Sequence, residues 1–354
     1  MKILHMADCH LDSAMEAHLP AVTAKKRRAE LLITFREAVD SAVRHGVSLV
    51  LIAGDLFDTK TPQRSTLSYV LSTLESHPEL FFIIIEGNHD EGALCEMPLP
   101  QNVLLVKAKE IQEKHFDGVS VYAAGYGVAG EAISSLEMDE DSINVLVAHG
   151  TVGYESEERE EIISRARIEK LPVDYLALGH YHSHRAERIG TRTTACYAGI
   201  PEGRGFDETG MCGVVLYDTD KSEARFLPTA KRTLHRICVD ITSCLTQRDI
   251  ENAVYTHVNE IPEEDMVHVT LSGRYRDTLE KNGEQIKALL SSKFYFSKLK
   301  DESVLAICPE DYKNDISLRG EFVRAVFAKE FSEEERGRIL AYGLRALSGE
   351  DPEG

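Results

Sequence analysis

The sequence predicts an α/β fold followed by a smaller α+β unit, and two observations support this. In the first half of the 354-residue chain, short apolar runs alternate with segments whose apolar residues recur at helical spacing. Beyond about Lys231 the pattern changes to several helical segments and a further apolar strand. We therefore predict two domains, residues 1–231 and residues 232–354.

The first part of the chain has the order β-α-β-α-β. Its predicted elements are strands at 3–7, 47–53 and 80–86 and helices at 24–45 and 62–77. Gly46 follows the first helix, and Pro62 lies near the first turn of the second. This order predicts a parallel or mixed sheet with helices on both faces.

Short strands complete the first domain, and the second domain is mostly helical. The remaining predicted elements are strands at 103–106, 119–124, 144–148 and 175–178, antiparallel strands between 188 and 226, a strand at 266–271, and helices at 247–259, 277–290, 318–331 and 332–348. Asp117-Gly118 predicts a hairpin turn.

The charge balance limits the partners that the chain attracts by itself. The formal net charge is −19, so the protein as a whole repels nucleic acid, anionic membranes and other polyanions. If the substrate carries phosphate, the positive charge beside it must come from bound metal ions or from a confined basic patch.

Cysteine usage and hydropathy predict a cytoplasmic protein with no membrane association. The seven cysteines are scattered and none forms a CxxC pair, which predicts free thiols rather than a zinc ribbon or a disulfide framework. The N-terminus lacks the charged-then-apolar pattern of a signal peptide. The apolar runs at 49–53 and 80–85 are too short to cross a bilayer.

Polar side chains follow five of the predicted strands at the point where each strand ends. In chain order they are Asp8 and His10, Asp55, Asn88 and His89, His149, and His180 and His182. Functional groups of an open α/β sheet gather beyond the carboxyl ends of its strands. We therefore expect these imidazole, carboxylate and amide groups to form one cluster.

This donor set predicts a pair of metal ions. Imidazoles with carboxylates and an amide, and no thiolate, suit Mn²⁺, Fe or Zn²⁺. Even seven of these eight donors exceed what one ion takes from side chains while keeping open positions, whereas two ions sharing a carboxylate account for the number. Such a pair holds a phosphate and generates hydroxide at neutral pH.

Taken singly, the blocks are weak signals. Asp8-Cys9-His10 alone says little, and Asp58 in Gly54-Asp55-Leu56-Phe57-Asp58 is either a turn cap or a group that orients a ligand histidine. Their order and their common place at strand ends make them specific. We interpret the other nine histidines as structural, with His184 as a rim residue of the site.

The ordered blocks resemble those of the calcineurin-like metallophosphoesterases over roughly the first two thirds of the chain. The matching blocks are Asp8-x-His10, Gly54-Asp55-x-x-Asp58, Gly87-Asn88-His89-Asp90, His149-Gly150 and Gly179-His180-x-His182. Within that superfamily, segments 52–61, 174–182 and 197–208 resemble the SbcD-type DNA repair exonucleases. The resemblance implies a sandwich of mixed sheets flanked by helices, with a C-terminal α+β capping domain.

The resemblance also implies roles for individual residues. It assigns Asp8, His10 and His182 to one metal ion, Asn88, His149 and His180 to the other, and Asp55 to both. His89 corresponds to a histidine that contacts the phosphate and assists departure of the leaving group, which agrees with general acid chemistry.

The function that follows is a Mn²⁺-dependent exonuclease hydrolysing DNA phosphodiester bonds in DNA repair. The alternative is a phosphodiesterase or phosphatase acting on a small phosphate ester at the same site. A scaffold without activity is disfavoured because every ligand position and His89 are present together. The resemblance further implies DNA as partner, an SMC-like coiled-coil ATPase, and a homodimer.

Two features depart from the SbcD-type pattern. The acidic stretch Glu155–Glu161 follows the His149 block and is an awkward neighbour for DNA phosphates. Only the helices near 318–348 are available as the tail that docks on an ATPase in that family. The basic cluster Lys25-Lys26-Arg27-Arg28 is either a nucleic-acid contact or the solvated start of a helix.

Overall fold

A computed structural model of the chain describes residues 1–15, 19–95, 97–128, 130–153, 162–277 and 279–347. The acidic stretch Glu155–Glu161 and residue 348 of the predicted last helix lie outside these ranges. The chain divides into two compact units, Met1–Thr233 and Leu234–Gly354.

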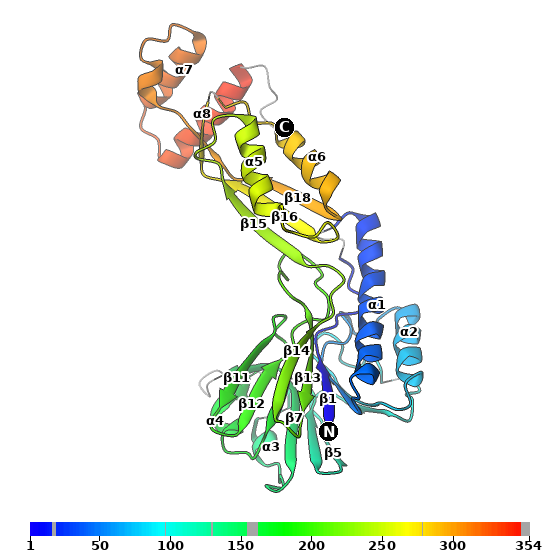
Figure 1. The fold of residues 1–354 in the computed structure, drawn as a ribbon. Helices are drawn as coiled ribbons and strands as arrows, with labels where there is room; N and C mark the ends of the chain where they lie inside the picture. Colours follow the sequence, from blue (N-terminus) through cyan, green and yellow to red (C-terminus); the bar gives the residue numbers. More distant parts are fainter. Residues whose placement is uncertain (16–18, 96, 129, 154–161, 278, 348–354) are drawn as a thin grey trace. The chain divides into compact units, whose positions relative to one another are not determined.

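The first unit is built on two six-stranded sheets, both of them mixed (Figure 1). The first sheet contains, in spatial order, β14 (Glu223–Pro228), β13 (Gly213–Asp218), β1 (Lys2–Met6), β2 (Leu49–Ala53), β3 (Phe81–Ile85) and β4 (Val103–Val106). The second contains β11 (Arg185–Ile189), β12 (Thr193–Tyr197), β10 (Tyr175–Gly179), β7 (Ile143–His149), β6 (Val119–Ala124) and β5 (Ile111–Phe116). These sheets confirm the predicted α/β class.

Parallel strands occupy the middle of each sheet. β1, β2, β3 and β4 are parallel to one another, and so are β6, β7, β10 and β12, whereas β13 and β14 of the first sheet and β5 and β11 of the second pair antiparallel with their neighbours. The stretch expected to be wholly antiparallel is therefore only partly so, because β12 also pairs in parallel with β10. Asp117-Gly118 joins β5 to β6, and the hairpin prediction is confirmed.

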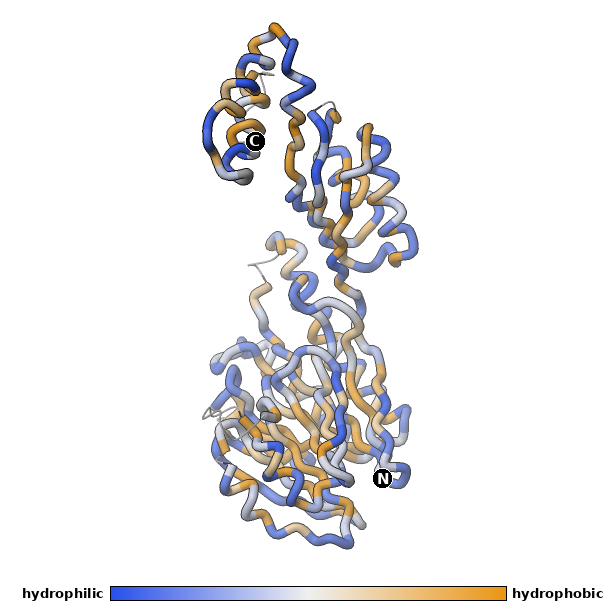
Figure 2. The backbone as a smooth tube through the Cα atoms, turned by 90° about the vertical axis from the view of Figure 1, so that its left-hand side faces the viewer, coloured by the Kyte–Doolittle hydropathy of each residue, from blue (hydrophilic) through white to orange (hydrophobic). Residues whose placement is uncertain are grey.

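The core lies between the two sheets. Side chains such as Ile3 and Leu51 of the first sheet pack against Val147 and Tyr175 of the second. The rings of Tyr175 and Tyr217 stack across this interface with centroids 4.1 Å apart. Every residue of β2 is buried, because this strand is covered on both faces. This explains why its sequence is a continuous apolar run. The core strands are the orange segments in the lower part of Figure 2.

The helices lie differently from the sequence prediction. α1 (Ala21–Arg44) and α2 (Arg64–Glu75) lie side by side along the first sheet (Figure 1), whose other face is covered by the second sheet instead of by helices. The physical reason is the monotonic strand order β1-β2-β3, since successive right-handed crossovers place their helices on the same face.

The outer face of the second sheet carries the smaller elements. α3 (Gly130–Ser134) and α4 (Arg165–Ile168) contribute Ile133 and Ile168 to a separate core on that face. β8 (Thr151–Gly153) and β9 (Ile162–Ser164) form a two-stranded parallel sheet beside them.

The second unit contains a three-stranded parallel sheet with helices on one face. Its strands are β15 (Leu234–Asp240), β16 (Met266–Ser272) and β18 (Phe296–Asp301), and its helices are α5 (Gln247–Val258) and α6 (Gly283–Lys293). A capping box between Thr246 and Asp249 begins α5. Only β16 was expected from the sequence, because β15 and β18 carry exposed polar or charged side chains at alternate positions and lack a continuous apolar run.

A small helical cluster completes this unit. It comprises β17 (Arg274–Arg276) paired with β19 (Val304–Ala306), the 3₁₀ helix η1 (Pro309–Tyr312), α7 (Leu318–Phe327) and α8 (Glu333–Leu347). Val323 of α7 and Leu340 of α8 are buried against Tyr312. Within the described ranges, no helix has the length and apolar character that a membrane span requires.

Candidate metal centre

The predicted site residues come from the carboxyl ends of strands in both sheets. β1, β2 and β3 end side by side in parallel register, and so do β7 and β10. Hydrogen bonds join the two edges: the backbone N–H of His180 donates to both carboxylate oxygens of Asp8 at 3.0 Å, and His149 Nδ1 lies 2.9 Å from the carbonyl oxygen of Ala53. The two-sheet sandwich therefore brings the carboxyl ends of strands from both sheets together.

Several of these residues have backbone angles that L-residues rarely adopt. Asp8, His10, Asp55 and His180 have φ values of 50°, 43°, 49° and 96°. Such strain persists only where surrounding contacts hold it, and it concentrates at functional sites. Gly87 shows how close the packing is, because a Cβ there would lie 2.1 Å from Asp55 Oδ1.

One group of candidate ligands consists of Asp8, His10 and His182, whose donor atoms lie within 4.8 Å of one another. His10 and His182 face each other with their Nε2 atoms 3.2 Å apart. The far side of each ring is engaged: His10 Nδ1 lies 2.9 Å from Asp58 Oδ1, and His182 Nδ1 lies 2.8 Å from Glu208 Oε1.

A second group surrounds His149. Its Nε2 lies 3.0 Å from Asn88 Oδ1 and 3.4 Å from Asp55 Oδ2. The ring of His180 approaches that of His149 edge-on, with centroids 5.4 Å apart. Asp55 Oδ2 is also 3.8 Å from His10 Nε2, so this carboxylate lies between the two groups.

The tautomers implied by these contacts suit a cation. A neutral imidazole that donates from Nδ1 presents a lone pair at Nε2. If His10 and His182 keep their protons at Nδ1, beside the carboxylates of Asp58 and Glu208, they point two lone pairs at each other, and His149 points one at Asn88 Oδ1 and Asp55. Groups of acceptors facing one another without a donor between them fit bound metal ions, so the chain carries a candidate dinuclear metal site.

The electrostatics point the same way. Burial raises the pKa of Asp8 to about 6. Burial alone would lower the pKa of His149, but the hydrogen bond to Asp55 and the charges of Asp8 and Asp55 raise it to about 9. Burial also opposes ionisation of Asp55, yet His149 holds the pKa of that carboxyl well below its usual range. The buried carboxylates of Asp8 and Asp55 thus favour a positive charge at His149, which a proton or a metal ion can supply.

His89 differs from the other histidines of the centre. Its backbone N–H donates to Asp55 Oδ1 at 2.9 Å, while its side chain is exposed. Its ring approaches that of His10 edge-on at 5.0 Å. His10, Asp58 and His89 also form a group with metal-ligand spacing, although Asp58 already contacts the Nδ1 of His10.

Three further residues support the centre, and the sequence interpretation missed them. Asp90 accepts hydrogen bonds from the backbone N–H groups of Leu56 and Gly87, both at 2.8 Å, and so joins the loop of Asp55 to the loop of Asn88. Glu208 contacts the Nδ1 atom of His182, and Arg204 in turn contacts Glu208. Burial and the charge of Asp55 raise the pKa of Asp90 to about 7. The sequence interpretation includes Asp90 in the Gly87-Asn88-His89-Asp90 block and Arg204 and Glu208 in the segment 197–208, but it assigns none of the three a role.

The structure resolves two open alternatives. Asp58 contacts His10 Nδ1, which favours its interpretation as an orienting group over a simple turn cap. In the basic cluster at residues 25–28, Arg27 is fully buried in ion pairs with Glu30 and Glu202, so neither a nucleic-acid contact nor a solvated position describes it. The run of four basic residues in the sequence therefore includes one, Arg27, that is buried in the fold.

Comparison with known proteins agrees with this geometry. A family model described as calcineurin-like phosphoesterase matches residues 1–184, the range that contains every predicted site residue. The uncharacterized metallophosphoesterase YhaO of Bacillus subtilis (strain 168) is 28% identical over 233 residues, which cover 61% of this chain and 57% of that protein.

Two archaeal proteins are similar over more of the chain. The DNA double-strand break repair protein Mre11 of Methanosarcina acetivorans is 26% identical over 336 residues, covering 88% of this chain and 52% of that protein. The protein of the same name from Saccharolobus solfataricus is 23% identical over 336 residues, covering 87% and 84%. The chain thus spans little more than half the length of YhaO and of the Methanosarcina protein.

Proposed function

The chain belongs to the calcineurin-like phosphoesterase family, and we propose that it hydrolyses phosphoric ester bonds at a two-metal centre in its first unit. The observation that carries this proposal is the set of facing acceptors: His10 and His182 Nε2 at 3.2 Å, and His149 Nε2 beside Asn88 and Asp55. Such an arrangement is electrostatically unfavourable without a cation between the groups.

The proposed ligands fall into two sets that share a carboxylate. They are Asp8, His10 and His182 for one ion, Asn88, His149 and His180 for the other, and Asp55 for both. When bound, two divalent ions supply positive charge to a phosphate and lower the pKa of water to near neutrality. Mn²⁺ is the ion we propose, with Fe or Zn²⁺ as alternatives, because the donors are nitrogen and oxygen without thiolate.

We assign His89 the role of general acid. Its side chain is the exposed histidine of the Asn88-His89 block, and its ring lies beside that of His10 at the surface of the centre. A protonated imidazole in that place donates a proton to the departing oxygen of a phosphoester. Asp55 accepts the backbone N–H of His89 and so holds this residue in register with the ligands.

DNA is the substrate class that we propose, with cleavage from an end and a role in DNA repair. Two of the similar proteins are named DNA double-strand break repair proteins, which supports this choice. The second unit supports it independently, through one face of its sheet. We regard this unit as a capping domain that contacts the nucleic-acid backbone.

The sheet of the second unit has an open face with basic side chains. Val267, Val269 and Leu271 of β16 pack against the helices, so the alternate residues face away from them. On that other face Arg236, His268 and Lys298 are paired across the three strands, and Lys300 follows two residues later. Arg236, Lys298 and Lys300 are exposed, and Lys300 is ion-paired with Glu302 at 2.5 Å. A row of cations is the type of surface that neutralises phosphates.

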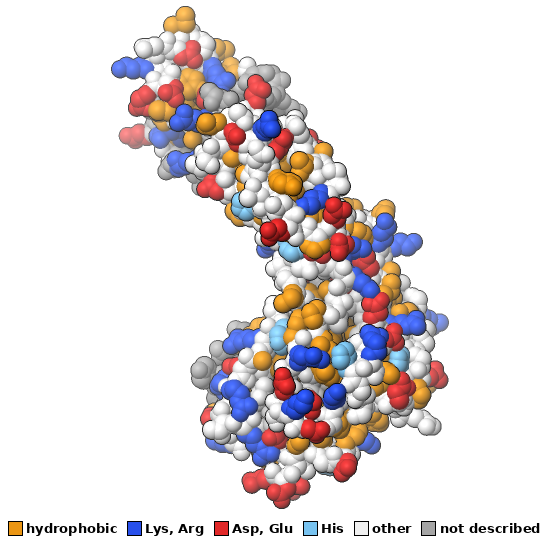
Figure 3. Space-filling view, in the orientation of Figure 1, with side chains coloured by type: hydrophobic (Ala, Val, Ile, Leu, Met, Phe, Trp, Pro, Cys, Tyr) orange, Lys and Arg blue, Asp and Glu red, His pale blue; other side chains and the backbone are white. Residues whose placement is uncertain are grey.

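The alternative, hydrolysis of a small phosphate ester at the same centre, is favoured by a different observation. The net charge is −19, and acidic and basic side chains are interspersed over the face seen in Figure 3. A small ester needs only the metal centre and no extended basic path. The proposals of an SMC-like ATPase partner and of a homodimer rest on the resemblance to SbcD-type nucleases.

The decisive experiment incubates the purified protein with Mn²⁺ and end-labelled linear DNA, both single- and double-stranded. A His89→Ala preparation controls for contaminating nucleases, and His257→Ala, an exposed histidine on α5, is the matched variant that should cleave normally. Metal-dependent release of nucleotides that only His89→Ala lacks supports the nuclease proposal. Hydrolysis of bis(p-nitrophenyl) phosphate without DNA cleavage supports the small-ester alternative, and inactivity on both rejects the proposed function.

A further inference from the structure

We infer that Arg204 is a positioning residue of the metal centre, which acts by holding the two carboxylates that orient His10 and His182. The inference rests on the proposed function, because it concerns the ligands of one proposed ion. It assigns a role to a residue outside the ligand set, on the loop that follows β12.

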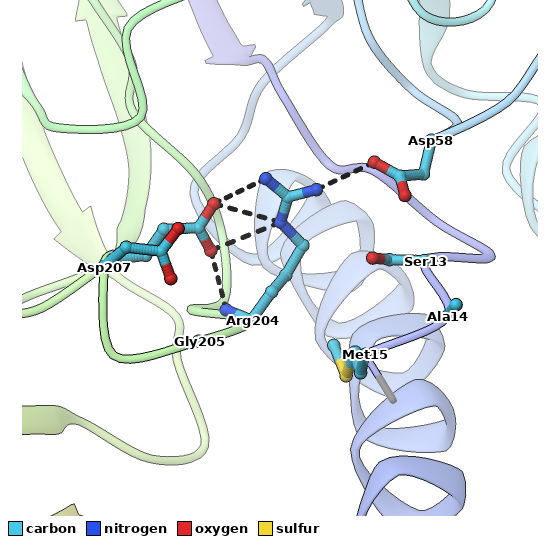
Figure 4. Close-up of a pocket in the computed structure, with 8 residues that line it drawn as sticks. Ser13, Ala14, Met15, Asp58, Arg204, Gly205 and Asp207 are labelled. Carbon is cyan, nitrogen blue, oxygen red and sulfur yellow. Dashed lines mark hydrogen bonds and ion pairs between the residues drawn. The ribbon is translucent and has the colours of Figure 1, made fainter. Parts of the chain in front are cut away.

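Arg204 contacts two carboxylates from different parts of the chain. Its Nη1 donates to Asp58 Oδ1 at 2.8 Å, and its Nη2 donates to Glu208 Oε1 at 2.5 Å. Its Nε lies 3.0 Å from Glu208 Oε1, and its backbone N–H donates to Glu208 Oε2 at 2.7 Å. Figure 4 shows Arg204 with its guanidinium directed to Asp58, and both residues line a pocket of about 290 Å³.

The carboxylate oxygens held by Arg204 are the same atoms that contact the histidines. Asp58 Oδ1 lies 2.9 Å from His10 Nδ1, and Glu208 Oε1 lies 2.8 Å from His182 Nδ1. The two histidines then meet at Nε2 with a separation of 3.2 Å. His10, Asp58, Arg204, Glu208 and His182 therefore form a closed ring of contacts, in which Arg204 lies opposite the pair of facing Nε2 atoms.

The chemistry of this position requires an arginine. Asp58 and Glu208 are like charges that would repel each other, and a guanidinium offers donors in a rigid plane that can serve both at once. A lysine supplies the same charge from a single point and cannot reproduce the fork. With both carboxylates held and ionised, each Nδ1 keeps its proton and each Nε2 keeps a lone pair for a ligand.

The contacts are confined to one of the two proposed ligand sets. None of the interactions described for Arg204 reaches Asn88, His149 or His180. Arg192 offers a comparison, since its Nε and Nη2 bind the two oxygens of Asp174 at 2.8 and 2.9 Å without touching any proposed ligand. The loss of Arg204 should therefore weaken one ion and spare the other, whereas the loss of Arg192 should affect neither.

The test is a titration of the metal-free 354-residue chain with Mn²⁺. Calorimetry measures the binding of each ion, and electron paramagnetic resonance measures the Mn²⁺ that stays free. Wild type should bind two ions. In Arg204→Gln we expect the affinity for one ion to fall roughly 10- to 100-fold, the range seen when partners behind ligands are removed, while the other ion binds as in wild type. Arg204→Lys should give a smaller loss, and Arg192→Gln should match wild type.

Circular dichroism and thermal unfolding show whether each variant is folded. If Arg204→Gln does not fold, the Mn²⁺ titration of Arg204→Lys tests the inference instead. Unchanged binding of both ions in the folded variant overturns the inference. Equal weakening of both ions also overturns it, because it contradicts an effect through His10 and His182. Failure of wild type to bind two ions instead rejects the proposed metal centre, and the wild-type titration distinguishes that result from a failure of the role of Arg204.

Discussion

At the scale of single residues, the centre depends on groups that hold strained ligands in place. Asp55 has a φ of 49° and lies in a loop whose backbone N–H groups at Leu56 and Phe57 are bound by Asp90. The preceding Gly54 has a φ of 84°, and a Cβ there would lie 2.3 Å from His149 Nδ1. The ligand positions are thus set by neighbours that leave no space for a larger residue.

Asp55 is the residue whose loss should affect both proposed ions. We expect Asp55→Asn to lose bound metal and to reduce hydrolysis of a chromogenic phosphodiester by at least about 100-fold, since a neutral amide replaces the shared negative charge. Metal analysis of the purified variant and steady-state kinetics measure the two effects. Asp139→Asn, an exposed turn residue, is the matched control. Full activity of Asp55→Asn would show that the shared-ligand assignment is wrong.

His5 lies three residues before Asp8 and should make stability depend on pH. It is fully buried beside the Tyr175 hydroxyl at 2.9 Å, and burial lowers its pKa to about 3. The unfolded state takes up a proton at His5 near the ordinary histidine pKa, and the folded state does not. The contribution of His5 to the free energy of unfolding is therefore present above that pH. It is lost as the pH falls toward 3, by up to roughly 1.4 kcal/mol per pH unit.

Urea unfolding of wild type and His5→Asn between pH 7 and 4 measures this contribution. The variant has no titrating group at this position, so its free energy of unfolding should fall less steeply with decreasing pH, whatever its absolute stability. His257→Asn, at an exposed position, should keep the wild-type slope. Parallel curves for wild type and His5→Asn would contradict the prediction.

At the scale of elements, α1 is joined to the loop after β12 by a buried ion pair. Arg27 of α1 donates to Glu202 Oε1 and to the carbonyl oxygen of Gly203, both at 2.6 Å, and neither charged group is exposed. Thr34 and the backbone N–H of Lys231 bind the other oxygen of Glu202 at 2.8 and 2.6 Å. This network fixes the beginning of the loop that carries Arg204 and Glu208.

Removing one partner of this pair should be costly. We expect Glu202→Gln to lower the free energy of unfolding by about 3–5 kcal/mol, because Arg27 is left buried with incomplete compensation. Glu187→Gln, which breaks the more exposed pair with Arg165, should cost less than about 1 kcal/mol. Denaturant unfolding at neutral pH compares the two variants. Equal effects would show that burial does not distinguish these pairs.

At the scale of the whole molecule, the two units have different chemical characters. The first contains all the candidate ligands, and the second contains an open parallel sheet with basic side chains on the face away from its helices. Parallel sheets are usually covered on both faces. Leu234 and Met266 are buried at one end of this face, whereas Arg236, Lys298 and Lys300 are exposed farther along it. Exposed cations on a parallel sheet are therefore unusual, and they support the proposed contact between the second unit and a nucleic-acid backbone.

Reversing two of these charges should separate DNA binding from chemistry. In Lys298→Glu/Lys300→Glu we expect weaker binding of linear DNA and a reduction of about 2 in the slope of log K against log salt concentration, since each phosphate contact contributes about 1. Hydrolysis of bis(p-nitrophenyl) phosphate should not change. Lys287→Glu, an exposed position on α6, is the matched control. An unaltered salt slope in the double variant would exclude this face from the DNA path.

The sequence by itself predicted the α/β class, most of the helices and the set of side chains that meet at the centre. It could do so because apolar periodicity is a local property, and because ligands at strand ends are brought together by any parallel sheet. The blocks at Asp8, Asp55 and Asn88 illustrate this, since each directly follows its strand.

Only the tertiary structure shows which elements cover the first sheet and which residues outside the ligand set contact the candidate ligands. The local pattern of α1 and α2 does not say on which face they pack, and a second sheet took the face expected for helices. Arg204 and Glu208 reach Asp58 and His182 across long stretches of chain, and Arg27 is buried by Glu202 in spite of its basic neighbours. These contacts depend on the packing of distant segments, and no local periodicity encodes them.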